Sequence, residues 1–166
     1  AMHTQHGAAP LTDTMKLFNM GLEGGKPKYG AVGVQSEWAY KGDGRWAVAP
    51  GGDIVSPSFA LDGGEEAEIA GLYVIGDQGE VLRVGFALAN EFSDHLMEKQ
   101  NYLYLAHSKL RQCSFGPEIL IGDLPAAIRG TVRIVRDCDV VWSGEFLSGE
   151  DHMSHSVANL EHHHFK

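Results

Sequence analysis

Residues 62–74 read Asp62-Gly63-Gly64-Glu65-Glu66-Ala67-Glu68-Ile69-Ala70-Gly71-Leu72-Tyr73-Val74. Acids crowd the start of this run and apolar residues fill its second half, a pattern that indicates a buried strand. Side chains alternate between the faces of a strand, so Glu66 and Glu68 share one face and Glu65 lies on the other. Neighbouring carboxylates repel each other, and a divalent cation would relieve that repulsion. On its own, the pair fits a solvated acidic strand end better than a metal site.

A hairpin follows from this strand, which we place at about 66–75. The turn Asp77-Gln78-Gly79-Glu80 separates it from an apolar run, Val81–Ala89, which we predict to be the return strand. The two strands are then antiparallel, and Asn90-Glu91 stands at the far end of the second one.

Glu91 therefore returns to the end of the sheet where Glu66 and Glu68 lie. Three converging carboxylates are the ligand set that Mg2+ or Mn2+ needs, with positions left for water and a chelating substrate. The alternative is that Glu91 caps a helix that begins at Ser93.

The other elements are assigned from apolar spacing and from capping and turn residues. The spacing predicts helices after Thr12 (ending at Gly24-Gly25), over 93–101 with Ser93 as N-cap, and over Met153–Phe165. It predicts short strands at Trp46–Ala49, Ile119–Ile121, Thr131–Arg136 and Val140–Phe146, a constrained turn at Cys113–Pro117, and a loop or frayed helix end over residues 1–10. Many short strands without βαβ alternation indicate a mainly β, α+β domain.

Composition limits the function classes. The 166 residues, 43% of them hydrophobic and 21% charged, predict a single folded domain over 1–166. The net charge of -9 argues against nucleic-acid binding. No membrane-spanning run or signal peptide is visible, so we expect a cytoplasmic protein with no membrane partner, in which Cys113 and Cys138 are reduced.

Lys109 is a candidate catalytic residue because it follows a run with little other charge, Tyr102–Ser108. A partly buried lysine near a metal site can have a lowered pKa and act as a base, or it can bind a substrate carboxylate. A lysine whose stem lies along the surface is an equal alternative.

Histidines cluster near the end of the chain, at His152, His155 and His162-His163-His164. Consecutive residues on a helix point about 100° apart, so three in a row cannot all bind one ion well. We therefore do not expect a zinc site there.

Several phrases together resemble the fumarylacetoacetate hydrolase superfamily, most closely its bacterial branch of sugar-acid enzymes. The phrases are Leu61–Glu66, Glu66-Ala67-Glu68, Asn90-Glu91-Phe92-Ser93, Ala106–Arg111, Ser114-Phe115-Gly116-Pro117, Phe18–Pro27 and Ala158–Lys166. The resemblance extends over essentially the whole chain. It implies a mixed β-roll, and members of the family extend beyond both ends of this chain, so we expect an incomplete roll.

The resemblance also implies the roles of individual residues. Glu66, Glu68 and Glu91 match three acids that hold Mg2+ or a similar ion (Mn2+ or Ca2+), the third being Asp in most of the superfamily. Lys109 matches a lysine that borders the substrate. Substrate contacts are expected at Tyr40, Lys41, Lys109 and Ser114, and a homodimer is expected as well.

The activity that the branch implies is the dehydration of a 2-keto-3-deoxy pentonate to 2-oxoglutarate semialdehyde in sugar breakdown. Relatives hydrolyse carbon–carbon bonds in acylpyruvates and other diketo acids. In both reactions a metal chelated by the 2-keto acid can stabilise an enolate. Two hypotheses are therefore a lyase and a hydrolase of a small 2-keto acid. A third is a catalytically incomplete piece that binds metal and partners but turns over nothing.

Overall fold

The computed structural model describes residues 11–165, so the loop or helix end predicted for residues 1–10 lies outside the described residues. The helices are α1 (Asp13–Gly24), η1 (Gly44–Trp46), α2 (His95–Gln100), η2 (Tyr102–Tyr104), α3 (Leu105–Ser108) and α4 (Val157–His164). The strands are β1 (Ala47–Val48), β2 (Gly64–Ile75), β3 (Val81–Ser93), β4 (Cys113–Phe115), β5 (Leu120–Ile121), β6 (Ile128–Arg136) and β7 (Asp139–Ser148).

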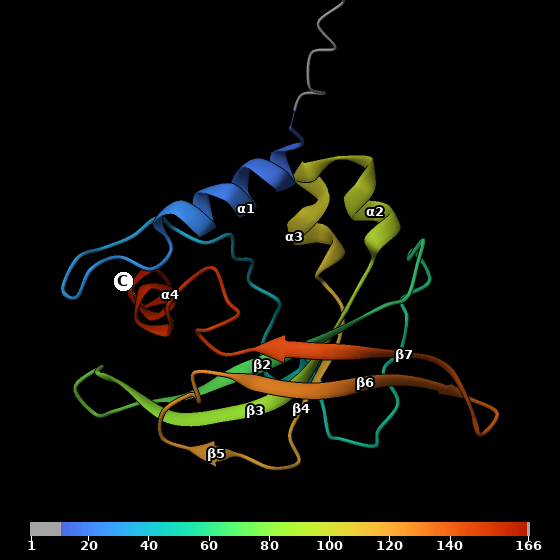
Figure 1. Ribbon diagram of the computed structural model, residues 1–166. Coiled ribbons are helices and arrows are strands. Elements are labelled where there is room, and N and C mark those ends of the chain that lie inside the picture. The colour runs from blue at the N-terminus through green and yellow to red at the C-terminus, as the bar shows by residue number, and fades with distance from the viewer. Residues whose placement is uncertain (1–10, 166) are drawn as a thin grey trace, which may run out of the picture.

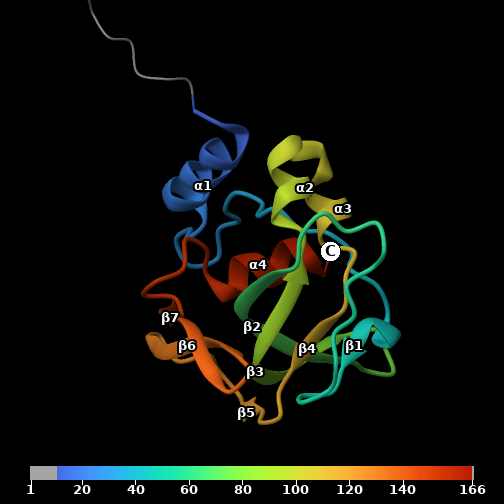
Figure 2. The same cartoon turned by 90° about the vertical axis from the view of Figure 1, so that its right-hand side faces the viewer.

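The α-helices gather on one side of the molecule and the strands on the other (Figure 1). One sheet has the order β1-β4-β3-β2, with β5 also paired to β3, and β6 and β7 form a separate two-stranded ribbon. In the perpendicular view, α1, α2 and α3 again lie above the strands, while α4 runs between α1 and β2 (Figure 2).

The central hairpin is formed by β2 and β3, as predicted. Its ladder runs from Ile75 opposite Val81 to Gly64 opposite Ser93, with a register shift between Leu72 and Tyr73. Leu72 pairs with Gly85 and Tyr73 pairs with Arg83, so Val84 is an extra residue on β3, a β-bulge.

The bulge decides which residue faces Glu66. Uninterrupted pairing from Ile75 and Val81 would place Asn90 opposite Glu66, and Glu91 would lie on the other face. With one extra residue on β3, Glu91 lies directly opposite Glu66 instead.

Two predictions at the end of β3 are wrong. The strand continues past Ala89 to Ser93, and the N-cap of α2 is Asp94, whose Oδ1 accepts a hydrogen bond from Met97 N at 2.9 Å. Ser93 does not cap because its hydroxyl is committed elsewhere, to the carboxylate of Glu66.

Other boundaries differ by a few residues. The predicted turn at Cys113 begins with strand β4, and the chain turns only at Gly116, whose φ of 104° favours glycine. Helix α4 begins at Val157 and not at Met153, because Ser156 accepts a hydrogen bond from Asn159 N at 3.2 Å and caps it. Helix α1 follows Thr12 as predicted, and Thr12 caps it by accepting a hydrogen bond from Met15 N at 3.2 Å.

The most enclosed part of the described chain lies where β3 meets α2 and the segment after α3. The buried residues there are Phe92, Ser93, Asp94, Ser108 and Arg111, while the other buried side chains of the described residues are Phe86 and Ala87 in the middle of β3 and Val157 and Asn159 on α4. Polar groups in such a place need partners, so the interior beside the acidic strand is organised by hydrogen bonds as much as by apolar packing.

Candidate metal centre

Three carboxylates converge at one end of the central hairpin. One ligand oxygen from each of Glu66, Glu68 and Glu91 lies within 4.8 Å of the others. The ladder explains this, because Glu91 is opposite Glu66 and is the diagonal neighbour of Glu68, whose own partner is Ala89. The structure thus brings together the three residues that the sequence predicted as metal ligands.

The donor set fits a hard divalent cation. Carboxylate oxygens bind Mg2+, Mn2+ and Ca2+, and oxygens that lie within 4.8 Å of one another are close enough to bind one such ion together. Three protein carboxylates leave open positions for water or a chelating substrate.

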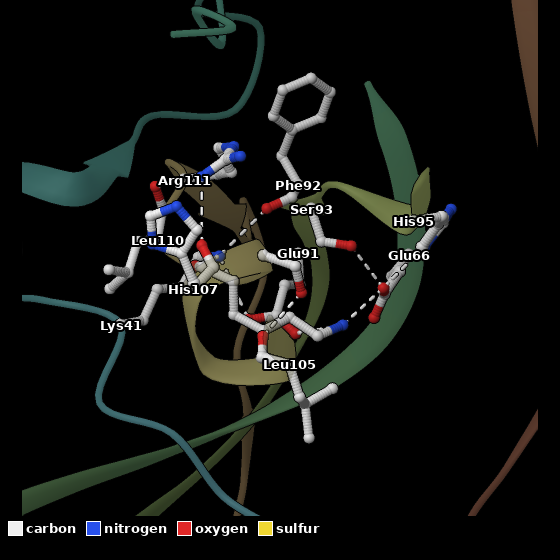
Figure 3. A network of polar contacts seen from close by, with 12 residues as sticks. Lys41, Glu66, Glu91, Phe92, Ser93, His95, Leu105, His107, Leu110 and Arg111 are labelled. Carbon is white, nitrogen blue, oxygen red and sulfur yellow. Dashed lines mark hydrogen bonds and ion pairs between the residues drawn. The ribbon is translucent and has the colours of Figure 1, made fainter. Parts of the chain in front are cut away.

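Glu66 is the most strongly held of the three acids. Its Oε1 accepts hydrogen bonds from Ser93 Oγ at 2.6 Å and Lys109 Nζ at 2.6 Å, and lies 2.8 Å from His95 Nε2 (Figure 3). Burial opposes the charge, but the three donors outweigh it and lower the pKa of Glu66. This carboxylate is therefore charged and fixed in position.

His95 reaches Glu66 because Gly64 has no side chain. A Cβ at Gly64 would lie 2.5 Å from His95 Cε1 and Nδ1, closer than packing permits. His95 and Ser93 are site residues that we did not identify from the sequence. Their place in the sequence could have identified them, because the predicted hairpin brings the residues just after Glu91 close to the start of the acidic strand.

Glu68 is the acid that lacks a donor of this kind. Burial by the surrounding chain and the charges of Glu91 and Glu66 raise the pKa of Glu68 to about 7, although its side chain still meets solvent. Near neutral pH this carboxylate is half protonated, and a bound cation would favour the charged form.

Lys109 lies between two of the acids. Its Nζ is 2.6 Å from Glu66 Oε1 and 3.6 Å from Glu91 Oε2, and its side chain is 15% exposed. Burial acts to lower the pKa of Lys109, but the hydrogen bond to Glu66 and the charges of Glu66 and Glu91 raise it. The expected lowered pKa is thus wrong for the metal-free chain, in which Lys109 is an ammonium ion.

The remaining predicted substrate contacts lie in different surroundings. Lys41 is part of the cluster, with its Nζ 3.2 Å from Glu91 Oε1. Ser114 lies on β4, paired with Asn90 of β3. Tyr40 is 71% exposed, and no hydrogen bond or ion pair described for residues 11–165 joins it to the acids. The substrate roles of these three residues stay predictions.

A buried ion pair supports the site from behind. Asp94 Oδ2 accepts hydrogen bonds from Arg111 Nη2 at 3.1 Å and from Leu61 N at 2.8 Å, and both charged side chains have 0% exposure. The Arg111 guanidinium also lies over the Phe59 ring, 4.9 Å from its centroid. The pair joins the residue after Ser93 to a residue just beyond Lys109.

The histidines near the end of the chain lie elsewhere. His155, just before α4, has its Nδ1 3.2 Å from Asn159 Nδ2, and His163 Nε2 on α4 is 2.9 Å from the carbonyl of Gly33. The contact of His163 attaches α4 to the loop after α1. No helix of the described residues is long and apolar enough to cross a membrane.

The fold is similar to solved structures of one enzyme. A structure of 2-keto-3-deoxy-D-arabinonate dehydratase complexed with magnesium and 2,5-dioxopentanoate is 25% identical over 70% of this chain and 38% of that chain, with a TM-score of 0.50. An apo form of 2-keto-3-deoxy-D-arabinonate dehydratase is 23% identical over 72% of this chain and 39% of that chain, with a TM-score of 0.53. This chain thus spans less than two fifths of each dehydratase chain.

No protein-family model matches the sequence, and no curated protein matches it. The structural likeness confirms the predicted fold class: the chain has the mixed α and β architecture of the fumarylacetoacetate hydrolase fold.

Proposed function

We propose that this chain carries the metal site of a lyase that dehydrates a 2-keto-3-deoxy pentonate to 2,5-dioxopentanoate (2-oxoglutarate semialdehyde). The observation that supports this most directly is the convergence of Glu66, Glu68 and Glu91 within 4.8 Å beside Lys109. The solved dehydratase of similar fold contains magnesium and 2,5-dioxopentanoate. That compound is itself a 2-keto acid of the kind that a three-carboxylate site leaves room to bind.

A divalent cation held by the three acids would supply positive charge for an enolate oxygen. The chain's own residues would then set the position of the proton transfer. Glu66 is fixed by Ser93 and His95, so the ligand geometry is prepared in advance.

Lys109 is the residue that we propose at the reacting end of the substrate. The groups that raise its pKa are Glu66 and Glu91, whereas burial lowers it. Once the charges of both acids are balanced, burial dominates, and Nζ can release its proton and act as a base. In its charged form the same group would anchor the substrate carboxylate.

The chemistry balances as an elimination. Lys109 Nζ takes a proton from C3, and the C4 hydroxyl takes up a proton and leaves as water, so a double bond remains between C3 and C4. C5 then loses a proton and C3 regains one, which moves the double bond to C4 and C5. This enol takes up a proton at C4 as its hydroxyl loses one, and the aldehyde results. A substrate with a second carbonyl in place of the C4 hydroxyl would instead favour attack by water and carbon–carbon cleavage. Whether the site dehydrates or cleaves a carbon–carbon bond thus depends on the group that the substrate carries at C4.

The test is turnover with Mg2+ and a 2-keto-3-deoxypentonate, with 2,5-dioxopentanoate as the product to be detected. No product there, combined with turnover of an acylpyruvate, would overturn the lyase proposal in favour of the hydrolase. Absence of turnover with both, while Mn2+ still binds, would favour a chain that binds metal without catalysis.

The metal site has its own test. Glu68→Gln should weaken Mn2+ binding by about 100-fold or more, since even outer partners of metal ligands contribute 10–100-fold. Glu145→Gln is the matched control, because Glu145 is an exposed strand carboxylate of the other hairpin and should leave the affinity unchanged. Unaltered affinity in Glu68→Gln would show that the site is assigned wrongly.

A further inference from the structure

Lys41 is held by the chain in a way that Lys109 is not. Its Nζ donates to the carbonyl oxygens of Lys109 at 2.7 Å and of Phe92 at 3.1 Å, and lies 3.2 Å from Glu91 Oε1 (Figure 3). Its side chain is 17% exposed. Two of the three N–H donors of this ammonium thus bond main-chain carbonyls, and its charge forms an ion pair with Glu91.

We propose that Lys41 is a positioning residue, which sets the third metal ligand and Lys109 relative to each other, and that it is not a substrate contact. The roles of Glu91 as metal ligand and Lys109 as base rest on the proposed function, whereas the positioning by Lys41 rests on its contacts. Phe92 adjoins Glu91 on β3, and the other carbonyl belongs to Lys109 itself. One side chain thus bridges the two segments that supply these residues.

The kind of acceptor separates the two lysines. Lys109 Nζ contacts carboxylates, which a cation can take over as ligands. Both hydrogen bonds of Lys41 Nζ go to main-chain carbonyls, whose positions are fixed by the backbone. Metal binding can therefore release Lys109 toward the substrate while Lys41 remains attached.

The bridge also orients Glu91. The Glu91 carboxylate lies between two ammonium groups, with Oε1 3.2 Å from Lys41 and Oε2 3.6 Å from Lys109. When Lys109 leaves, Lys41 is the cation that still fixes one oxygen of Glu91. The other oxygen is then available to an ion.

Charge and position make opposite predictions for a lysine-to-methionine change. Removing a positive charge beside three acids should tighten cation binding, whereas losing the group that orients a ligand should weaken it. Methionine keeps much of the length of lysine but has no charge and no donor. We expect Lys109→Met to bind Mn2+ more tightly than the unaltered chain, and Lys41→Met to bind it about tenfold more weakly.

The control for loss of an ordinary lysine anchor is Lys26→Met. Lys26 Nζ donates to the main-chain carbonyl of Glu150, and neither residue belongs to the acid cluster. This variant loses a comparable lysine–carbonyl bond and should keep the Mn2+ affinity of the unaltered chain. Affinities are measured by electron paramagnetic resonance with substrate absent, so a substrate-binding role cannot produce the effect.

Tighter Mn2+ binding by Lys41→Met, equal to that of Lys109→Met, would overturn the proposal. If the substrate is turned over, a substrate contact at Lys41 predicts a raised KM without weaker metal binding. A positioning residue predicts a lowered kcat at saturating substrate and Mn2+.

Amide hydrogen exchange tests the bridge even if the chain binds no metal and the proposed function fails. Two main-chain hydrogen bonds lie near the Lys41 contacts. Asp94 N donates to Ser108 O at 3.1 Å, which joins the two segments that Lys41 bridges, and Arg111 N donates to Lys109 O at 2.8 Å within the second segment. In the metal-free chain, Lys41→Met should speed exchange of these amides and Lys109→Met should not. Unchanged exchange in Lys41→Met would overturn the proposal by itself.

Discussion

The two long hairpins of this chain are built alike and use charge in opposite ways. Each carries one register shift, between Leu72 and Tyr73 in the first and between Ile134 and Val135 in the second. In β2–β3, two glutamates stand directly opposite each other. In β6–β7, the charged residues that stand directly opposite each other are Arg136 and Asp139, and Arg129 forms an ion pair with Glu145 at 3.0 Å.

Like charges opposite each other destabilise a sheet, and opposite charges support it. The β6–β7 ribbon therefore pairs opposite charges within itself, and its ion pair lies at the surface, with 65% of the Arg129 side chain and 60% of the Glu145 side chain exposed. The β2–β3 hairpin needs cations from outside its own strands, and receives them from Lys41 and Lys109. An unfavourable pairing that the rest of the chain maintains is the mark of a binding site.

The largest expected effect comes from removing the buried pair behind the first hairpin. Asp94→Ala leaves the Arg111 guanidinium buried without its counter-charge and removes the cap of α2. The free energy of unfolding should fall by about 3–5 kcal/mol, measured by urea denaturation. A loss below about 1 kcal/mol would show that this buried pair contributes no more to stability than an exposed ion pair such as that of the second hairpin.

A smaller effect is expected from the charge of Glu68. Its pKa is raised from 4.5 to about 7 in the folded chain, so the folded state binds more protons than the unfolded state between these values. The free energy of unfolding should therefore fall as pH rises between these two values. Above about pH 7 the whole loss caused by ionising Glu68 is present.

Glu68→Gln removes this dependence. Allowing for partial solvent screening of the carboxylate, we expect the variant to exceed the metal-free parent in Tm by roughly 2–4 °C at about pH 8 and to match it at about pH 5. Saturating Mg2+ should reverse the order at the higher pH, since only the parent binds the ion well. A Tm difference that does not vary with pH would contradict the raised pKa.

The smallest effect is expected on the second hairpin. Arg129→Met breaks the exposed ion pair with Glu145, and should change the free energy of unfolding by about 1 kcal/mol or less. High salt should reduce even that difference, because exposed charges are screened. A loss comparable to that of Asp94→Ala would remove the contrast between the hairpins.

Much of the first hairpin could be predicted because its signals are local. The turn residues at Asp77–Glu80 and the apolar run after them define two antiparallel strands. The alternation Glu66-Ala67-Glu68 places two acids on one face and Glu65 on the other, where its carboxylate accepts a hydrogen bond from the Asn90 side chain. The cap at Thr12 is similarly local.

The remaining features depend on contacts between distant residues. Gly85 inside the apolar run is compatible with a bulge, but equally with a close approach of another strand, and only the paired structure shows the bulge that puts Glu91 on the correct face. Ser93 has the composition of a helix cap, and only the proximity of Glu66 explains why it is a strand residue. The use of the Lys41 donors depends on two carbonyls that are 51 and 68 residues away in the sequence.

The bulge at Val84 has a consequence for how this chain can vary in length. The turn at 77–80 lies beyond the bulge, so insertions and deletions there leave the acids opposite each other as long as the bulged register holds. Deleting Val84 itself would convert the ladder to continuous pairing with Glu91 still facing Glu66. A single deletion between Gly85 and Glu91 would instead move Glu91 to the other side of the sheet. Length changes are thus tolerated at the tip of this hairpin, and near its base only in steps of two.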